Sequence, residues 1–273
     1  MLDRRTCLRW LAGALPGGRL LAGPLFPTTV ADRVDRRYET PGPRPAGLKA
    51  TRDGLWILDQ ATGSAYLVHF ATGQVKLEIE TGVTRPAAIE TDEVGLWIAA
   101  EDGRKMVRLD FFEEEDGKIK KDQVIRKSEF DVPGAGPVKW RLAGEPPDPI
   151  GAQGLAWRRG ELYAAVPSAA AIHVLKQDGS VLRTLPAPGI CPQGLAWDPD
   201  GKLWCADALS RSFFKLDPAT GKIIKQHFLP FAKPEVDGKV IVPHGLTIWQ
   251  RMIYFCSLET GELYRTPLVN RME

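Results

Sequence analysis

A short motif of small residues followed by Leu or Ile recurs five times along the chain, and it constrains the fold more than any other feature. Its copies are Pro45-Ala46-Gly47-Leu48, Pro86-Ala87-Ala88-Ile89, Ala152-Gln153-Gly154-Leu155, Pro192-Gln193-Gly194-Leu195 and Pro243-His244-Gly245-Leu246. Each copy precedes a second apolar stretch that contains an aromatic residue, as in Leu203-Trp204-Cys205. The Leu or Ile positions are separated by 41, 66, 40 and 51 residues. A period near 40 residues is typical of folds in which every copy forms one supersecondary unit.

Two sets of turn residues divide each repeat into short strands. The first set separates the two apolar stretches and comprises Asp53-Gly54, Val94-Gly95, Arg159-Gly160, Asp200-Gly201 and Gln250-Arg251. The second set lies further along four of the repeats and comprises Thr72-Gly73, Asp116-Gly117, Asp178-Gly179 and Thr220-Gly221. Pairs that contain Gly supply the positive φ that a tight hairpin turn requires. Each repeat therefore predicts four short antiparallel strands, which together form one blade of a β-propeller.

The spacing predicts an all-β fold with a single propeller over residues 32–273 and five four-stranded blades. The interval of 66 residues contains an insertion over about residues 131–149, which is too short for another blade. Only 27 residues follow Leu246, and the 14 residues 34–47 precede the first anchor, so the two ends together make one blade. We expect residues 34–39 to supply the outer strand of the last blade and close the ring. A six-bladed ring, with a degenerate blade inside the insertion, is the alternative.

The formal net charge of +2 is unevenly distributed. Residues 1–31 carry four arginines against one aspartate, so residues 32–273 have a net charge of about −1. A nearly neutral body has no field to hold nucleic acid or an acidic membrane surface. No later apolar run reaches the roughly 18 residues of a membrane span.

The N-terminus predicts an export signal over residues 1–31. Arg4-Arg5-Thr6-Cys7-Leu8-Arg9 resembles a twin-arginine signal, and an Ala/Gly/Leu-rich run follows it. Thr29-Val30-Ala31 has the small residues of a cleavage site. We therefore expect a periplasmic or extracellular protein, with a basic cytoplasmic N-terminus as the alternative. Removal of the signal would leave three cysteines, Cys191, Cys205 and Cys256, without C-x-x-C spacing, which favours buried thiols over a zinc site.

Propeller geometry restricts where a site can lie. The residue before each anchor Gly and the last residue of each second strand should share one face of the ring, around the axis. The first set is Ala46, Ala87, Gln153, Gln193 and His244, and the second is Asp59, Ala100, Val166, Asp207 and Ser257. From these positions and their neighbours we expect ligand-binding roles for Gln153, Gln193, Asp59, Glu101, Arg44 and Arg85.

His244 and Asp207 are the candidate catalytic residues on this face. An imidazole titrates near neutrality, so His244 oriented by the carboxylate of Asp207 would form a general base. The alternative is that His244 and Gln193 bind loop backbone and hold the turns. The other three histidines, His69, His173 and His227, fall in outer strands, where surface or packing roles are expected.

The segment Pro192-Gln193-Gly194-Leu195-Ala196-Trp197-Asp198-Pro199-Asp200-Gly201-Lys202-Leu203-Trp204 resembles the repeat of bacterial propellers of the NHL-repeat, virginiamycin B lyase-like and gluconolactonase-like groups. The resemblance covers residues 44–130 and 150–269 and implies the fold, whereas these groups differ in chemistry. Gluconolactonase-like enzymes hold a divalent metal on the axis with Glu, Asp and Asn. The only Asn here is Asn270, at the chain end, so the comparison disfavours such a metal, and we expect no cofactor.

Two further resemblances concern catalysis. The lyase-like group uses a His at the anchor and an acid near the end of the second strand, and Pro243-His244-Gly245 is similar to the first part. The corresponding acid position is Ser257, with Glu259 two residues later. Ala152-Gln153-Gly154-Leu155 and Glu161-Leu162-Tyr163 resemble the five-bladed glutaminyl cyclotransferases, but Ala164 stands where that family has Glu.

The function expected from these observations is binding of a small molecule or peptide on the axial face by an exported propeller. A lyase or hydrolase of the virginiamycin B lyase-like or gluconolactonase-like type, and a glutaminyl cyclotransferase-like enzyme, are the alternatives. Pro-rich residues 131–149 are a candidate lid or docking loop. The sequence leaves the oligomeric state open.

Overall fold

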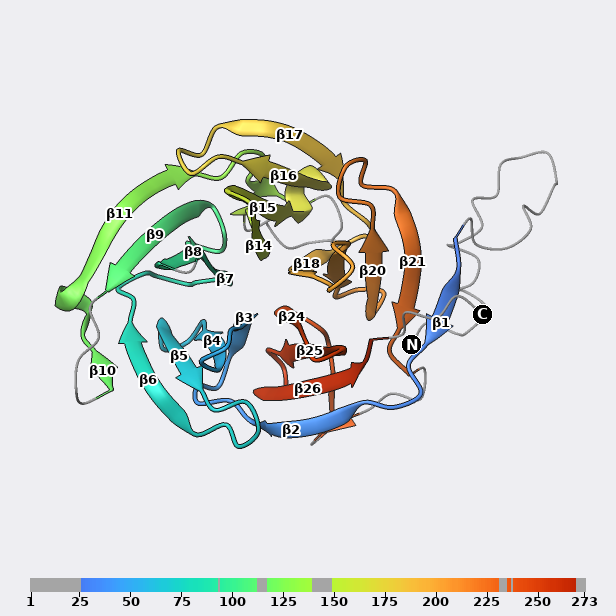
Figure 1. Ribbon diagram of the computed structural model, residues 1–273, viewed down its shortest axis with the longest axis horizontal. Coiled ribbons are helices and arrows are strands. Elements are labelled where there is room, and N and C mark those ends of the chain that lie inside the picture. Colours follow the sequence, from blue (N-terminus) through green and yellow to red (C-terminus); the bar gives the residue numbers. More distant parts are fainter. Residues whose placement is uncertain are drawn as a thin grey trace.

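Five antiparallel sheets surround a central axis and form a β-propeller (Figure 1). The computed structural model describes residues 26–92, 94–111, 117–138, 149–230, 235–236 and 238–268. Each blade has four antiparallel strands, the first next to the axis and the fourth on the outside. The prediction of an all-β, five-bladed propeller is therefore confirmed.

Four of the blades take their strands in chain order. The first comprises β3 (Pro45–Ala50), β4 (Leu55–Asp59), β5 (Ser64–Val68) and β6 (Val75–Glu80). The second comprises β7 (Ala88–Thr91), β8 (Leu96–Ala100), β9 (Lys105–Phe111) and β11 (Val124–Asp131). The third comprises β14 (Gly154–Arg158), β15 (Glu161–Val166), β16 (Ala171–Leu175) and β17 (Val181–Pro186). The fourth comprises β18 (Pro192–Trp197), β19 (Leu203–Asp207), β20 (Ser212–Leu216) and β21 (Ile223–Phe228).

The fifth blade joins the two ends of the chain, as the residue count predicted. It comprises β24 (Leu246–Trp249), β25 (Met252–Ser257), β26 (Glu262–Pro267) and the N-terminal β2 (Asp35–Glu39). β2 pairs antiparallel with β26, and Asp35 accepts a hydrogen bond from Arg265 Nε at 3.2 Å. This pairing closes the ring, so no blade edge is left unpaired at the junction.

The remaining elements are short additions to the ring. β1 (Thr28–Val30) pairs parallel with β21, and β10 (Lys118–Ile119) pairs parallel with β6. Two short hairpin-like pairs join β12 (Gly136–Pro137) to β13 (Pro149–Ile150) and β22 (Glu235–Val236) to β23 (Lys239–Val240). The 3₁₀ turns are η1 (Lys121–Gln123) and η2 (Pro167–Ala169). The described part of the insertion thus holds one two-stranded pair and no sixth blade. Residues 139–148 of the candidate lid or docking loop, which include Trp140 and Arg141, lie outside the described residues.

The residues that mark the predicted cleavage site belong to the propeller. Thr29 and Val30 lie in β1, the backbone N–H of Ala31 donates to Phe228 O at 2.8 Å, and Ala31 is buried. The ring of Phe26 packs edge-on against Phe214, with 6.4 Å between centroids. Residues 26–31 therefore extend the fourth blade by a fifth strand.

Hairpin turns connect the strands as the sequence predicted. Gln250 and Arg251 have φ of 46° and 60°, and Arg159 and Gly160 have φ of 52° and 82°. Positive φ at both central residues is the geometry of a type I′ hairpin turn, whose twist matches that of the flanking strands. The non-Gly residues at these turns accept a backbone strain that Gly would avoid.

The hydrophobic core consists of five clusters, each between two neighbouring blades. Between the second and third blades, for example, Trp97 stacks on Trp157 with 6.2 Å between ring centroids. Between the fourth and fifth blades, Phe213 packs against Phe255. Full burial of one such side chain stabilises the fold by about 1.5–3 kcal/mol, so the interfaces between blades hold the ring together.

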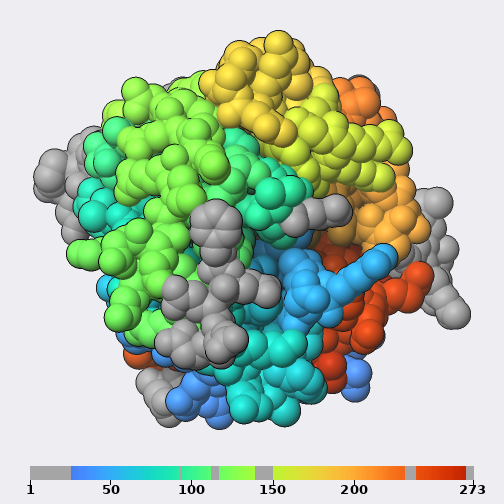
Figure 2. Space-filling view, turned by 60° about the vertical axis from the view of Figure 1, so that its left-hand side comes forward, coloured from blue at the N-terminus to red at the C-terminus, as the bar shows by residue number. Residues whose placement is uncertain are grey.

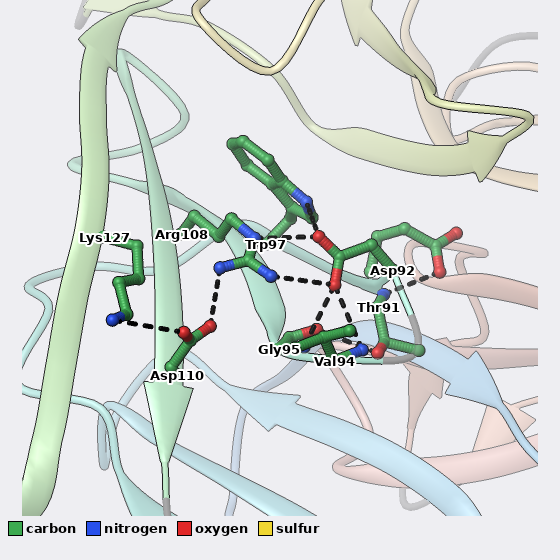
Figure 3. Close-up of polar contacts among 9 residues, drawn as sticks. Thr91, Asp92, Val94, Gly95, Trp97, Arg108, Asp110 and Lys127 are labelled. Carbon is green, nitrogen blue, oxygen red and sulfur yellow. Dashed lines mark hydrogen bonds and ion pairs between the residues drawn. The ribbon is translucent and has the colours of Figure 1, made fainter.

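An aspartate whose side chain is largely shielded from solvent anchors the second-strand Trp in two of the blades. In the second blade, Asp92 accepts hydrogen bonds from Trp97 Nε1 at 3.0 Å and from Arg108 Nε at 2.8 Å (Figure 3). Burial alone would raise the pKa of Asp92, but the hydrogen bonds from Arg108 and neighbouring donors hold it below its usual value. In the fourth blade, Asp198 plays the same part toward Trp204 and Lys215. These networks are structural, since every partner belongs to the blade frame.

The axis of the ring is filled by backbone. Glycines at the anchor positions bring neighbouring inner strands so close that a Cβ at Gly154 would collide with Gln193 O, and one at Gly194 with Leu246 N. The cavity that remains there is about 10 Å³, at most the space of one water molecule. A ligand must therefore bind on an end face of the ring rather than within its axis.

The order of neighbouring blades can be followed on one face of the molecule. Figure 2 shows the green outer strand β11 of the second blade beside the blue and cyan residues of the first blade, with the red residues of the fifth blade beyond them. This order matches the ring in Figure 1, in which the first blade lies between the second and the fifth. The fold thus holds the blade ends in fixed relative positions.

Candidate functional site

The predicted shared face exists. Each inner strand starts at the blade end where the second strand finishes, as the register partners Pro45–Asp59 and Pro192–Asp207 show. We call this end of the ring the top face. The top face carries the starts of the inner strands and the turns between the second and third strands. His244 lies on it, directly before Gly245 at the start of the fifth blade's inner strand.

Asp207 is a structural residue of this face. It is fully buried, and its carboxylate accepts hydrogen bonds from the backbone N–H groups of Ile190, Cys191 and Ser210, each at 2.7 Å. The hydroxyl of Ser210 donates a further one at 2.7 Å. All these partners belong to loops of its own blade. The expected pair of Asp207 with His244 is therefore corrected: the carboxylate is saturated by its loops, and another acid holds the imidazole.

Asp59 has the same structural role in the first blade. Its buried carboxylate accepts hydrogen bonds from the backbone N–H groups of Arg44 at 2.6 Å, Ala61 at 3.0 Å and Thr62 at 2.8 Å. It therefore ties the loop that enters the blade to the turn between its second and third strands. Asp59 is not placed to bind a ligand directly.

In the fifth blade a serine occupies the position of these aspartates. Ser257 is fully buried, and its hydroxyl accepts a hydrogen bond from the backbone N–H of Val242 at 3.2 Å. The same hydroxyl donates to Glu259 Oε2 at 2.7 Å. The other carboxylate oxygen of Glu259 lies 3.0 Å from His244 Nε2. Because Ser is shorter than Asp, the carboxylate two residues later takes part in the network and reaches His244.

The His244–Glu259 pair has the geometry of an oriented base. The side chain of His244 is 13% exposed and that of Glu259 is 38% exposed, so both can be reached from solvent. Burial raises the pKa of Glu259, but the hydrogen bonds and charge of His244, together with Ser257, hold it below its usual value. An ionised Glu259 can only accept this hydrogen bond, so Nε2 of His244 carries the proton. In the neutral form of the imidazole, the lone pair then lies on Nδ1. No other described residue hydrogen-bonds to this Nδ1.

The two predicted glutamines make internal contacts. Gln153 Nε2 donates to the carbonyl of Asp102 at 2.9 Å and so links the second and third blades. Gln193 is mostly buried, and its Nε2 donates to Cys191 Sγ at 3.2 Å. Gln193 still neighbours the histidine, since Gly194 N donates to His244 O at 2.9 Å. Ligand contact by either glutamine stays a prediction.

The predicted charged residues lie on the rim of the first and second blades. Arg44 is exposed and donates to Gln60 Oε1 at 3.3 Å. Arg85 pairs with Asp102 at 3.0 Å, and Glu101 pairs with Arg104 at 3.4 Å. Exposed pairs of this kind contribute little to stability, so they leave these groups available to a ligand.

The remaining histidines have the surface or packing positions that were expected, with His69 exposed and His173 partly buried, and the described thiols are buried. His227 is fully buried with Nδ1 2.9 Å from Thr29 Oγ1, and burial lowers its pKa to about 4. The three cysteines at 191, 205 and 256 are free and buried. Burial raises the pKa of Cys191 to about 11 and that of Cys256 to about 12, so neither is an activated nucleophile.

Three further observations on the described residues concern metal clusters, membrane-spanning helices and a further cavity. Within the described ranges, no group of three or more His, Cys, Asp or Glu side chains is placed to hold a metal ion. The same part of the chain contains no helix that is long and apolar enough to span a bilayer. A polar cavity of about 360 Å³ lies at the rim of the first blade, but its Ser64, Glu78 and Glu80 bind one another or Lys118. The expectations about cofactors and partners stay predictions.

Solved structures with the same fold include a glutaminyl cyclase from Myxococcus xanthus, with a TM-score of 0.61 and 14% identity over 88% of this chain and 97% of that chain. A luciferin-regenerating enzyme matches with a TM-score of 0.55 and 13% identity over 87% and 96% of the two chains. A virginiamycin B lyase from Staphylococcus aureus has a TM-score of 0.47 and 16% identity over 85% and 70%. No protein-family model and no curated protein matches the sequence.

The fold and these comparisons define the chain as a β-propeller. The resemblance to bacterial propellers that the repeat indicated is confirmed at the level of the fold. Because propellers of one architecture carry different chemistries, function has to be argued from the residues on the top face.

Proposed function

We propose that this protein binds a small molecule or peptide on its top face, over His244. The observation that carries the proposal is the His244–Glu259 pair, with Nε2 held 3.0 Å from the carboxylate and the side chain open to solvent. The axis below is closed, so a ligand would lie across the blade ends. Gln193, beside His244, and Arg44 and Arg85 on the rim are the further contacts we expect.

The blade frame does not need the side chain of His244. Two hydrogen bonds fix the backbone of His244: its N–H donates to Cys256 O, and its carbonyl accepts from the N–H of Gly194. The matching positions in two other blades are Ala46 and Ala87, whose side chains form no hydrogen bond. A polar side chain that the fold does not require is best explained by a role toward a ligand.

A second candidate function is proton transfer on the bound ligand, as in a lyase. The pair supports it, because Glu259 would stabilise the imidazolium that forms when Nδ1 accepts a proton. The resemblance to the lyase-like group implied a His at the anchor and an acid near the end of the second strand, and Glu259 supplies an acid to His244. The glutaminyl cyclotransferase-like alternative expects a Glu at position 164. This chain has Ala164 there, and its side chain is buried between the second and third blades.

The test is a ligand screen with matched histidine variants. Wild type, His244→Ala and His69→Ala would be screened by thermal shift against a library of metabolites and dipeptides, with dissociation constants measured for every hit. His69 is exposed at the end of an outer-layer strand and serves as the control. We expect hits to lose about tenfold or more in affinity in His244→Ala and to keep it in His69→Ala. Equal affinity in all three proteins would refute the site.

Export is part of the proposal and is tested separately. Cell fractionation should find the wild-type full chain outside the cytoplasm. The double variant Arg4→Lys/Arg5→Lys should stay in the cytoplasm. A cytoplasmic wild-type protein would refute export and leave the ligand site intact.

A further inference from the structure

One partly buried cation on the top face, Arg211, has no ion-pair partner among the described residues. Arg211 ends the turn between β19 and β20 in the fourth blade, with a φ of 50°. Its Nε donates to the carbonyl of Ile241 at 3.0 Å. Its buried terminal nitrogen Nη2 has no hydrogen-bond partner, and no carboxylate among the described residues lies within ion-pair distance of the guanidinium.

This arrangement is costly for a half-buried charge. A guanidinium offers five N–H donors, and groups of this kind inside proteins are normally paired or saturated with hydrogen bonds. Burial lowers the pKa of Arg211, which is the sign of an uncompensated cation. The other Arg of this face with positive φ, Arg85, has Asp102 as its partner. A site that leaves a cation unpaired in the free protein is prepared for an anion.

The position of Arg211 connects it to the His244–Glu259 pair. Ile241, whose carbonyl binds Arg211, directly precedes Val242. The N–H of Val242 donates to Ser257 Oγ, which in turn donates to Glu259. The guanidinium therefore lies against the same linker that builds the network behind the imidazole, where the fourth and fifth blades meet (Figure 1).

We propose that Arg211 recognises an oxyanion of the ligand, a carboxylate or a phosphate, and holds it next to His244. This inference rests on the proposed top-face site and names the class of its ligand. The guanidinium suits both oxyanions, because its terminal nitrogens make no hydrogen bond to the described residues and its charge strengthens a hydrogen bond to either oxyanion. An anion held there places the rest of the ligand across the exposed edge of His244.

The experiment uses the histidines as reporters. The full chain has only four, so protein labelled with ¹⁵N-histidine gives few signals, and His244→Gln assigns the relevant one. Wild type would be titrated with sodium acetate and with sodium phosphate, and with sodium chloride at equal ionic strength as the reference. We expect saturable shifts of the His244 signals with acetate, phosphate or both, and the probe that binds identifies the oxyanion.

Two arginine variants then test the assignment. Arg211→Gln should weaken the affinity for the active probe by about 10- to 100-fold, the usual effect of losing a charged hydrogen-bond donor. Arg159→Gln is the matched control, since Arg159 also has positive φ, 52°, but is exposed in the turn between β14 and β15 on the opposite face. It should bind like wild type. Unchanged signals of the other three histidines would show that each variant is folded.

The outcomes separate this inference from the proposed function. Wild-type affinity in Arg211→Gln, with His244 signals still moving, would overturn the role of Arg211 and leave the top-face site standing. Shifts that chloride reproduces at equal ionic strength would overturn the oxyanion site altogether. Loss of binding in His244→Ala during the ligand screen is measured independently, so failure of either proposal is recognisable by itself.

Discussion

Asp207 should be essential for stability, and the size of the effect follows from its contacts. Its buried carboxylate accepts three backbone hydrogen bonds and one from the Ser210 hydroxyl. In Asp207→Asn the amide NH₂ must face either the Ile190 and Cys191 N–H groups or the Ser210 N–H, so at least one buried donor loses its partner. An unsatisfied buried donor costs about 1–3 kcal/mol, and we expect a loss of about 2 kcal/mol for Asn. Asp207→Ala, which orphans all three N–H groups, should cost about 4 kcal/mol.

The assay is equilibrium unfolding in urea, with the free energies of unfolding compared at unchanged slope. Asp178→Asn provides the control, because Asp178 is exposed and binds only Ser180 within its own turn. We expect this control, and His244→Ala, to stay within about 1 kcal/mol of wild type. A loss below about 0.5 kcal/mol for Asp207→Asn would refute the structural role and reopen a catalytic one.

Four further predictions concern titration, thiols and metals. In His244→Ala the pKa of Glu259 should rise, because burial then acts without the opposing imidazole; NMR titration of the carboxyl carbon would show no change if the pair is absent. Cys191 and Cys256, with pKa of about 11 and 12, should react with a thiol reagent at pH 8 only after unfolding, and rapid labelling of folded protein would contradict their burial. Burial lowers the pKa of His227 to about 4, whereas the unfolded chain has a value near 6.5. Its contribution to the free energy of unfolding is therefore complete above about pH 6.5 and is lost as the pH falls toward 4. A free energy of unfolding that does not change between pH 7 and 4 would contradict this. Element analysis of purified protein should find no stoichiometric divalent ion, and one removed only by chelation would reverse that expectation.

The sequence was sufficient for the fold because the repeat carries its own geometry. The anchors, the turn at Gln250-Arg251 and the residue count that joined 34–39 to the last blade all appear as expected. Local turn chemistry and a fixed period determine strand pairing, and neither depends on distant side chains.

The site was less accessible to sequence reasoning, since sharing a face does not fix side-chain partners. Asp207 and His244 lie on the same face, but the carboxylate binds the nearer backbone donors of its own blade. The available signal was the serine at position 257, where the first and fourth blades have Asp, followed by Glu259. No sequence pattern pointed to Arg211, because only the structure shows that its guanidinium has no ion-pair partner.

If the proposed export signal is cleaved after Ala31, strand β1 makes folding compete with that cleavage. A peptidase that recognises Thr29-Val30-Ala31 needs this segment extended and free, whereas the folded chain pairs it with β21 and buries Ala31. Cleavage after folding is then limited by how often the segment detaches, so its rate follows the population of that open state. A chain cut before folding would instead lack its fifth strand and expose the imidazole of His227. Under the export proposal, the order of cleavage and folding would thus decide whether the outer edge of the fourth blade carries β1.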